Sequence, residues 1–321
     1  MASPRLSLGT LRPAFAPEWV AIAALVLVDI VWVRVIGFHL RVGAVLLLTP
    51  FVLLLLIVVP RALGRGRIAL FFEYVALSLL GSFALIILSY LCMASSGPLA
   101  DPWLLAADRA LGFDWLGLYR RIAQHPALMT AMEFTYDSLL VQSLYVTVLL
   151  GLRSDPGEMR SLWRLSTIGC ILCSLGAMAA PALGPFHDFG MDAKGIFLPA
   201  MKQLLAKENL SFDAATLTGV ICFPSYHTVL ALTCPWALRR SGALFRIFIG
   251  LNGLMLFTIP FFGGHYLTDM IAGAGVFAVA LGIVTLLERA PLLALRPAQR
   301  EAIGTTPHAA PLIPSLARDK A

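Results

Sequence analysis

The sequence predicts an all-α integral membrane protein with eight transmembrane helices. Of its 321 residues, 59% are hydrophobic and only 13% are charged, and the mean hydropathy is +0.84. A soluble domain is about 45–50% apolar and about 25% charged. The apolar residues are also gathered in runs of roughly 20, which is the length that a helix needs to cross the bilayer. Together these observations exclude an ordinary soluble globular protein.

Eight apolar runs are long enough to be spans. We expect them at about residues 18–37, 42–60, 68–93, 128–151, 162–183, 224–240, 243–262 and 264–287. The last six are expected to form a helical bundle, with two long outer loops at 94–127 and 184–223. The first loop is rich in aromatic residues, including Trp103 and Trp115, which favours an interfacial amphipathic helix over a solvated loop.

The basic residues predict the orientation. If the N-terminus is cytoplasmic, sixteen of the twenty-four Lys and Arg residues fall in cytoplasmic segments, as the positive-inside rule requires. We therefore expect an N-in, C-in protein of a bacterial inner membrane, with a flexible cytoplasmic tail at 290–321. Because the net charge of +6 comes from small groups between apolar runs, no nucleic-acid partner is expected. In this topology the sixth and eighth spans both begin on the outer, periplasmic side.

The eighth span is expected to begin with the motif GGHYLTD at 263–269. Residues i and i+4 share one face of a helix, so Asp269 is expected to hydrogen-bond one ring nitrogen of His265. The other nitrogen would then be free to act as a nucleophile or a base. Gly263 and Gly264 would let backbone or substrate approach closely.

The sixth span is expected to begin with the motif CFPSYHT at 222–228. Pro224 suits a first helical position and Ser225 is a good cap, so His227 is expected in the first helical turn. Two helix N-termini that meet at one place favour a phosphate-like anion.

A plainer interpretation exists for each histidine alone, which is a polar residue in the headgroup layer. An HxxxD pattern can also arise by chance. The paired arrangement favours a functional site, because both histidines open a span on the same side. An ionisable group such as Asp269 inside an apolar run is also costly and usually functional.

Four stretches carry a resemblance to a known family. PSYH at 224–227 and HYLTD at 265–269, followed by IAG, resemble the second and third signature blocks of the type 2 phosphatidic acid phosphatase superfamily. PALGPF at 181–186 and DRALGFDW at 108–115 are similar to its bacterial members.

The resemblance covers roughly residues 68–287. It implies a six-helix catalytic core at 68–289 with the outer interfacial loop 94–127. Residues 1–67 would then be a cytoplasmic tail and two extra transmembrane helices.

Within the superfamily the chain resembles the inositol phosphorylceramide synthase (aureobasidin-target) branch and its bacterial relatives, which transfer a phosphorylated headgroup between lipids. The phosphatase pattern has an arginine six residues before the third-block histidine, where this chain has Ile259, and the KxxxxxxRP first block is absent. Another cation is therefore expected to hold the phosphate. Arg120 and Arg121 are the first candidates, followed by Lys194 and Lys202; contact with solvent or lipid headgroups is the alternative.

The resemblance implies a metal-independent double displacement that needs no cofactor. His265 would attack phosphorus and form a phosphohistidine, and Asp269 would orient it. His227 would protonate the leaving oxygen and later activate the incoming water or lipid hydroxyl. These roles agree with the pattern of a positioned nucleophile, an orienting acid and a separate proton carrier.

Five further residues are expected to bind the substrate. Ser225, Tyr226 and Gly264 belong to the two motifs, and Tyr136 and Asp137 lie in the outer half of the fourth span. The last two would hold a hydroxyl-rich headgroup or position the proton-carrying histidine. Hydrogen bonding between helices is the alternative for them.

The sequence thus predicts an enzyme that acts on a phospholipid or lipid phosphate at the outer face of the membrane. It is either a headgroup phosphotransferase or a simple phosphatase of phosphatidate or isoprenyl phosphate. A proton-coupled transporter would need polar residues through the full depth of the bilayer, whereas here they gather on one side. An inactive scaffold would not need to keep all of His227, His265 and Asp269.

Overall fold

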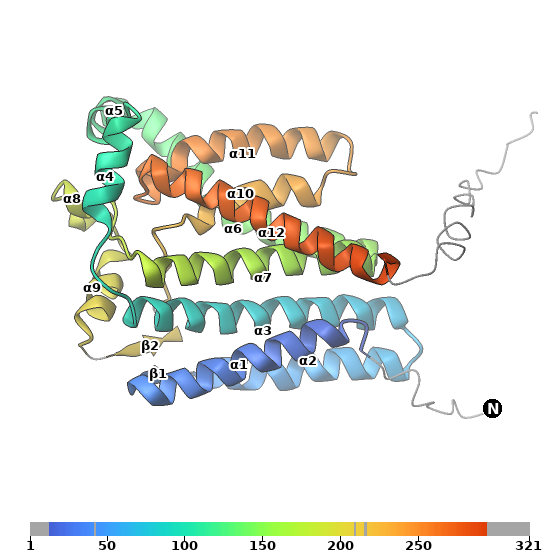
Figure 1. Cartoon of the computed structure of the whole chain (residues 1–321). Coiled ribbons are helices and arrows are strands. Elements are labelled where there is room, and N and C mark those ends of the chain that lie inside the picture. The colour runs from blue at the N-terminus through green and yellow to red at the C-terminus, as the bar shows by residue number, and fades with distance from the viewer. Residues whose placement is uncertain (1–12, 42, 209, 215–216, 294–321) are drawn as a thin grey trace, which may run out of the picture. The chain divides into compact units, whose positions relative to one another are not determined.

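The computed structural model describes residues 13–293 except 42, 209, 215 and 216, and this part of the chain is almost wholly helical (Figure 1). Six of its helices are long and apolar enough to cross a membrane: α1 (Ala16–Ile36), α3 (Gly66–Ala94), α6 (Pro126–Arg153), α7 (Pro156–Ala179), α11 (Ala243–Phe262) and α12 (Leu267–Leu293). The prediction of a multi-pass helical membrane protein is confirmed.

One of the eight expected spans is shorter than the sequence predicted, whereas α2 (Ala44–Ala62) has 19 residues, the same length as the expected span at 42–60. α10 (Tyr226–Ala237) has twelve residues and is preceded by a loop. The number of eight spans therefore stays a prediction.

The two long loops contain short helices. Residues 94–127 form α4 (Asp101–Ala110) and α5 (Trp115–Ala123), so two helices stand where one interfacial helix was expected. Trp103 is 82% exposed, as an interfacial residue would be, but Trp115 is only 2% exposed. The Trp115 Nε1–H donates to the Pro260 carbonyl oxygen at 2.9 Å, so this side chain anchors the loop to α11.

The second loop holds α8 (Pro185–Asp188), the 3₁₀ helix η2 (Asp192–Lys194), α9 (Leu198–Ala206) and a strand that the all-α prediction missed. This strand, β2 (Ser211–Asp213), pairs in parallel with β1 (His39–Arg41), which follows α1. Two strands of three residues are too short to show an alternating pattern in the sequence. Their pairing joins the end of α1 to the segment that leads to CFPSYHT.

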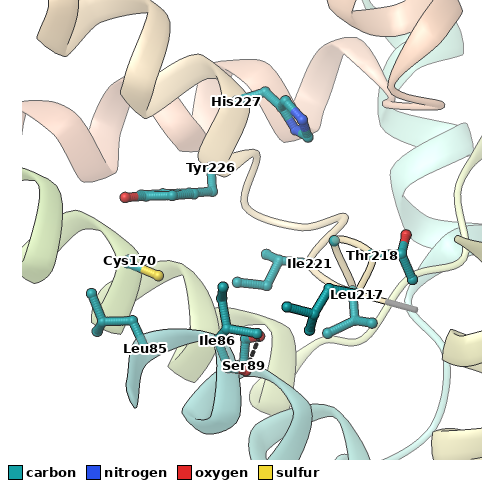
Figure 2. A pocket seen from close by; sticks show the side chains of 11 residues that line it. Leu85, Ile86, Ser89, Cys170, Leu217, Thr218, Ile221, Tyr226 and His227 are labelled. Atoms are coloured by element: carbon teal, nitrogen blue, oxygen red, sulfur yellow. Dashed lines mark hydrogen bonds between the residues drawn. The ribbon is translucent and has the colours of Figure 1, made fainter. Parts of the chain in front are cut away.

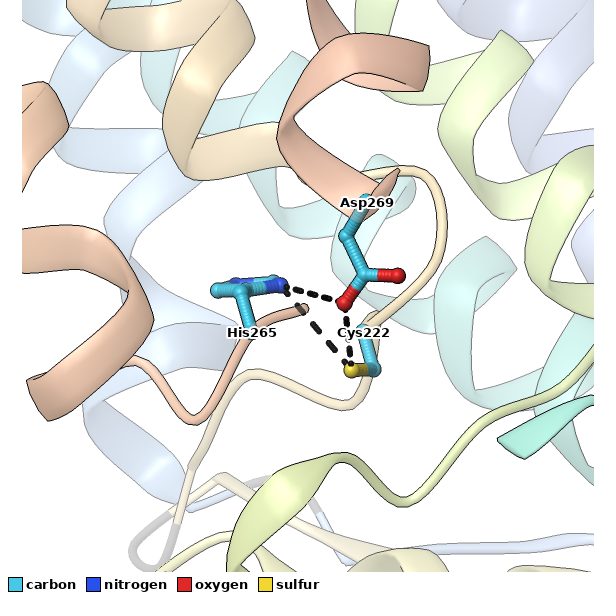
Figure 3. Close-up of side chains that lie close together, drawn as sticks. All are labelled: Cys222, His265 and Asp269. Atoms are coloured by element: carbon cyan, nitrogen blue, oxygen red, sulfur yellow. Dashed lines mark hydrogen bonds and ion pairs between the residues drawn. The ribbon is translucent and has the colours of Figure 1, made fainter. Parts of the chain in front are cut away.

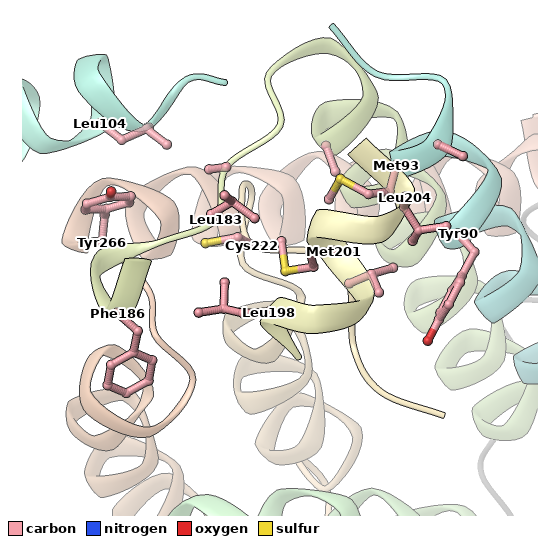
Figure 4. Packing of buried hydrophobic residues seen from close by; sticks show 14 of the residues in the cluster. Tyr90, Met93, Leu104, Leu183, Phe186, Leu198, Met201, Leu204, Cys222 and Tyr266 are labelled. Carbon is pink, nitrogen blue, oxygen red and sulfur yellow. The ribbon is translucent and has the colours of Figure 1, made fainter. Parts of the chain in front are cut away.

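The largest buried cluster lies at the end of the bundle that carries the motifs (Figure 4). There the last turns of α3 meet α9 and the loops, and Tyr90, Met93, Leu198, Met201 and Leu204 interdigitate. Interiors packed in this way are dense and resist displacement. The motif loops are therefore held by a rigid core.

Buried ion pairs join α2 to α3 and α1 to α7. Glu73 is 1% exposed and pairs with Arg61, while its other oxygen accepts from the Phe15 amide. Glu18 is 2% exposed and pairs with Arg164 at 2.5 Å. Both arginines are among the sixteen basic residues expected from the sequence on the cytoplasmic side. Here they neutralise buried carboxylates, which would be costly without a partner.

Candidate active site

His265 and Asp269 are in contact, as the sequence predicted (Figure 3). The His265 Nδ1 lies 3.3 Å from Asp269 Oδ2, and the two side chains are 1% and 0% exposed. His265 lies in the loop between α11 and α12, where burial lowers its pKa to about 4. The ring is therefore neutral at pH 7. With the proton on Nδ1, the lone pair is on Nε2.

The helical reason given for this contact is wrong, because α12 begins at Leu267 and His265 precedes it. Asp269 instead lies in the first turn and reaches back over the helix start. Its Oδ2 accepts from the Tyr266 amide at 2.9 Å as well as facing His265. This contact is the acidic half of a capping box, in which the side chain of the third helical residue accepts from the backbone amide of the residue that precedes the helix.

The N-terminus of α12 is not available to a substrate anion. Asp108 of α4 accepts from the amides of Leu267 and Thr268, each at 2.8 Å, and from Thr268 Oγ1 at 2.6 Å. A carboxylate already occupies the positive end of the helix. The expectation of two free helix N-termini at one site is therefore wrong for α12.

His227 lies in the first turn of α10, and Ser225 caps that helix by accepting from the Thr228 amide. The His227 Nδ1 is 3.4 Å from His265 Nε2, so the two motifs meet. On its other side, the His227 Nε2 is 2.9 Å from the hydroxyl of Tyr136 on α6. One nitrogen of His227 is thus held by Tyr136 while the other faces His265.

A second layer of carboxylates holds the loops around His265. Asp101 is 3% exposed and accepts from the amides of Leu183 and Gly184. The hydroxyl of Tyr266, the neighbour of His265, donates to Asp101 at 3.1 Å and to Asp188 at 2.5 Å. Burial raises the pKa of Asp188, and the Tyr266 hydroxyl partly offsets this.

A cavity of about 170 Å³ opens beside the two histidines. Its polar wall is formed by Tyr136, His227 and His265, and Phe197 and Phe262 are among its apolar lining residues. The described residues that line it include no lysine or arginine. A phosphate in this cavity would meet hydroxyl and ring N–H groups rather than a fixed side-chain cation.

The predicted phosphate-binding cations do not line this cavity. Arg120 and Arg121 are exposed on α5, because Trp115, Tyr119 and Ile122 form the buried face of that helix. Lys194 is exposed in η2.

Lys202 pairs with Asp192 at 2.5 Å, and His187 lies 3.1 Å from the same carboxylate. These two partners lower the pKa of Asp192, with Lys202 the larger cause.

The remaining predicted residues divide between the cavity and other surfaces. Ser225 Oγ is 3.4 Å from His265 Nε2, and Gly264 takes a φ of +63°, which favours glycine. Tyr226 points away from His265 and donates to the Ser166 carbonyl oxygen on α7. Asp137 is exposed, because a helix turns successive residues by about 100° and Tyr136 takes the inward position.

A larger apolar cavity of about 310 Å³ adjoins the site (Figure 2). Leu85 and Ile86 of α3 and Cys170 of α7 are among its lining residues, and Tyr226 and His227 are at its boundary. His227 lines both this cavity and the smaller one. An apolar chain and a phosphate could therefore be bound side by side.

Sequence reasoning missed three residues that organise the site: Asp101, Asp108 and Cys222. The two aspartates are seven residues apart, so they share one face of α4. That spacing was the signal that could have found them. Cys222 opens the CFPSYHT motif, and its thiol donates to Asp269 Oδ2 at 3.2 Å. Burial, and then the Asp269 charge, raise the pKa of this thiol well above its usual value.

Two glycines of α12 provide a test of how closely this helix approaches the CFPSYHT loop. A Cβ on Gly273 would lie 2.5 Å from the Ser225 carbonyl oxygen, whereas one on Gly275 would meet nothing within 4 Å. Gly273→Ala is expected to destabilise the fold by about 1–3 kcal/mol and to lower activity, because it displaces Ser225.

Gly275→Ala is the matched control and is expected to stabilise the helix by about 0.5–1 kcal/mol. Thermal denaturation in detergent and turnover measure both variants. Equal effects of the two substitutions would contradict the close approach.

Comparison with protein families agrees with this geometry. The family model of the PAP2 superfamily matches residues 102–283, which is more than half of the chain and includes both histidine motifs. Searches of the curated proteins and of the solved structures each found no match. The chain belongs to the PAP2 superfamily.

Proposed function

We propose that this protein is a membrane lipid-phosphate phosphotransferase that works through a phosphohistidine on His265. Membership of the superfamily supports a phosphatase- or phosphotransferase-type enzyme acting on lipid phosphate esters. The observation that carries the proposal is the row formed by Asp269, His265 and His227, joined at 3.3 and 3.4 Å. This row supplies an oriented nucleophile and a separate proton carrier.

In the first step, His265 Nε2 attacks phosphorus and the bond to the lipid oxygen breaks. His227 acts here as the imidazolium, with a proton on each ring nitrogen. Its Nε2–H donates to the Tyr136 oxygen, 2.9 Å away, and its Nδ1 proton passes to the leaving oxygen, which departs as an alcohol. His227 is then neutral, and its Nδ1 is free to take a proton in the second step. Asp269 stabilises the positive charge that develops on the His265 ring.

In the second step, water or a lipid hydroxyl attacks the phosphohistidine. His227 Nδ1 takes the proton of the attacking group, and the phosphorus–nitrogen bond breaks to restore neutral His265. With water the product is free phosphate, or the free headgroup phosphate where the phosphorus carries a headgroup; with a lipid hydroxyl it is a new phospholipid. Both outcomes use the same residues.

The apolar cavity next to His227 supports a substrate with a hydrocarbon chain. Its lining residues from α3 and α7 are almost all apolar, and it shares His227, Thr218 and Ile221 with the smaller cavity. Burying one chain there would contribute about 0.8 kcal/mol per CH₂ group. The phosphate at the other end would lie beside His265.

The place of the missing arginine supports the synthase-like version. Ile259 is fully buried among Leu139, Ala231 and Met255, so no cation would fit there without repacking. We infer that contacts between the protein and the headgroup attached to the phosphate supply part of the substrate's binding free energy. Such dependence would suit an enzyme that transfers a phosphorylated headgroup, as in the inositol phosphorylceramide synthase branch.

The proposal also includes the arrangement in the membrane. Residues 68–289 would be the catalytic core, and 1–67 would add two helices and a cytoplasmic tail. The site would open on the outer face of a bacterial inner membrane. The clustering of His227, His265 and the outer loops at one end of the bundle supports this orientation.

The test combines trapping with product analysis. Purified protein in detergent is given a ³²P-labelled phospholipid or lipid phosphate and quenched in alkali, with and without a lipid alcohol such as ceramide or diacylglycerol. We expect acid-labile, alkali-stable label on the protein and, with the alcohol, a new labelled phospholipid. Free phosphate as the sole product would overturn the transferase version, and absence of both label and product would overturn the proposal.

A further inference from the structure

Three potential metal ligands converge on one point beside the nucleophile. Cys222 Sγ is 3.2 Å from Asp269 Oδ2 and 3.9 Å from His265 Nδ1, and the last two atoms are 3.3 Å apart (Figure 3). All three side chains are buried. They come from two segments, the loop before α10 and the stretch from His265, in the loop before α12, to Asp269 in the first turn of α12. The core described above holds the two segments together.

These separations fit a tetrahedral zinc ion. With Zn–S of about 2.3 Å and Zn–N and Zn–O of about 2.0–2.1 Å, ligand atoms at a tetrahedral site are roughly 3.3–3.6 Å apart. The observed distances of 3.2, 3.3 and 3.9 Å bracket this range. A thiolate, an imidazole and a carboxylate form a donor set for Zn²⁺, whereas Mg²⁺ and Ca²⁺ prefer oxygen ligands alone.

The charge and access of the cluster also favour a divalent cation. The Asp269 Oδ1 is buried and has no hydrogen-bond partner in the described part of the chain, and the only ion pair of this carboxylate there is with His265. A thiolate and a carboxylate together would neutralise Zn²⁺, which removes the cost of a buried net charge. Cys222 and His265 both line the cavity beside the histidines, through which an ion and a fourth ligand could enter.

We propose that Cys222, His265 and Asp269 form an inhibitory zinc-binding site. Zinc displaces the thiol proton, which leaves to solvent, and takes the lone pair of His265 Nδ1. The proton that Nδ1 carried moves to Nε2, because a neutral imidazole keeps one proton. The nitrogen that would attack phosphorus then has no lone pair. The inhibitory effect rests on the proposed function, whereas the zinc site itself does not.

The first experiment measures binding without any substrate. Protein stripped with a chelator is titrated with Zn²⁺ by calorimetry, and Cd²⁺ is used to look for the ultraviolet absorption of a metal-bound thiolate. We expect one ion per chain with a thiolate band. Cys222→Ser should lose the band. Loss of a residue that only supports a metal ligand lowers metal affinity by roughly 10–100-fold, and loss of the ligand Cys222 itself should lower zinc affinity by more than this.

Two variants serve as controls. Cys234→Ser changes another buried thiol, in α10, which lies near Ser143 and outside the cluster, and it should bind zinc like the wild type. His187→Ala removes the exposed pair with Asp192, a surface place where zinc could bind adventitiously. Binding that is lost in His187→Ala but kept in Cys222→Ser would overturn the proposal, as would the absence of a thiolate band.

The second experiment measures turnover of a lipid phosphate at rising Zn²⁺, with Mg²⁺ in parallel. Zinc should inhibit the wild type and Cys234→Ser at the concentration at which it binds, while Mg²⁺ should not. Cys222→Ser is compared with its own zinc-free rate and should need a higher concentration. Stoichiometric zinc binding through Cys222 without inhibition would overturn the inhibitory role. If the protein were inactive on every lipid phosphate, the proposed function would fail, but the binding experiment would still decide whether the zinc site exists.

Discussion

Replacing His265 with asparagine is expected to abolish turnover and the covalent label together. Asparagine keeps a group that can donate to Asp269, so the buried carboxylate is not left alone. It has no nucleophilic lone pair, however, and loss of a covalent nucleophile is expected to cost on the order of 10⁴-fold or more in kcat. Steady-state rates on a lipid phosphate and ³²P trapping check both effects.

The partner variant His227→Asn separates the two histidines. Loss of a general acid–base is expected to cost about 10²–10⁴-fold. With an aryl phosphate the leaving group needs no proton, so the protein should still become labelled while the label turns over slowly. His125→Asn is the control, since this exposed residue before α6 makes no capping hydrogen bond. A labelled His265→Asn protein would show that another residue is the nucleophile.

Replacing Asp108 with alanine is expected to destabilise the start of α12 more than any other loss of a cap in the described chain. The carboxylate is 1% exposed and accepts from Leu267 N, Thr268 N and Thr268 Oγ1. An unsatisfied buried donor costs about 1–3 kcal/mol and a lost cap about 0.5–2. Because these costs overlap, we expect a loss of about 2–4 kcal/mol, together with a fall in kcat as Asp269 shifts.

Asp114→Ala provides the matched comparison. Asp114 caps α5 from an exposed position with one hydrogen bond, to the Gly117 amide at 2.9 Å. Its removal should cost no more than about 1 kcal/mol and leave kcat unchanged. Asp108→Asn, which keeps one acceptor oxygen, should fall between the two. Thermal denaturation in detergent that ranked Asp108→Ala and Asp114→Ala equally would contradict the capping role.

The helices and the meeting of the motifs could be predicted from the sequence because each depends on local patterns. Apolar runs long enough to span the bilayer predicted both ends of α3, α6 and α11 to within two residues, and those of α7 to within six. Ser225, expected as a helix cap, predicted the start of α10, and the charge asymmetry predicted that His227 and His265 share a side.

The features that were missed depend on contacts between residues far apart in the chain. α12 begins two residues after His265 because a carboxylate 159 residues earlier caps it. Arg120 and Arg121 are close to the site in the predicted topology, but only packing decides that Trp115 and Tyr119 take the inward face of α5. The parallel pairing of β1 with β2 likewise joins segments that no local pattern connects.

The shortness of α10 has a consequence for the depth of the reaction. Twelve residues rise about 18 Å, whereas the hydrocarbon core is about 30 Å thick. If α10 and the loop before it cross the bilayer together, the rest of the distance is irregular chain, which a membrane tolerates only where protein or a watery recess encloses it. That loop is enclosed: the Ser225 amide donates to the Asp269 carbonyl oxygen, and Tyr90 holds Thr218.

His227 would then lie below the headgroup plane, at the floor of such a recess. A lipid could reach His227 by lateral diffusion from the leaflet, with its acyl chain remaining in the hydrocarbon core and only its headgroup entering the watery recess.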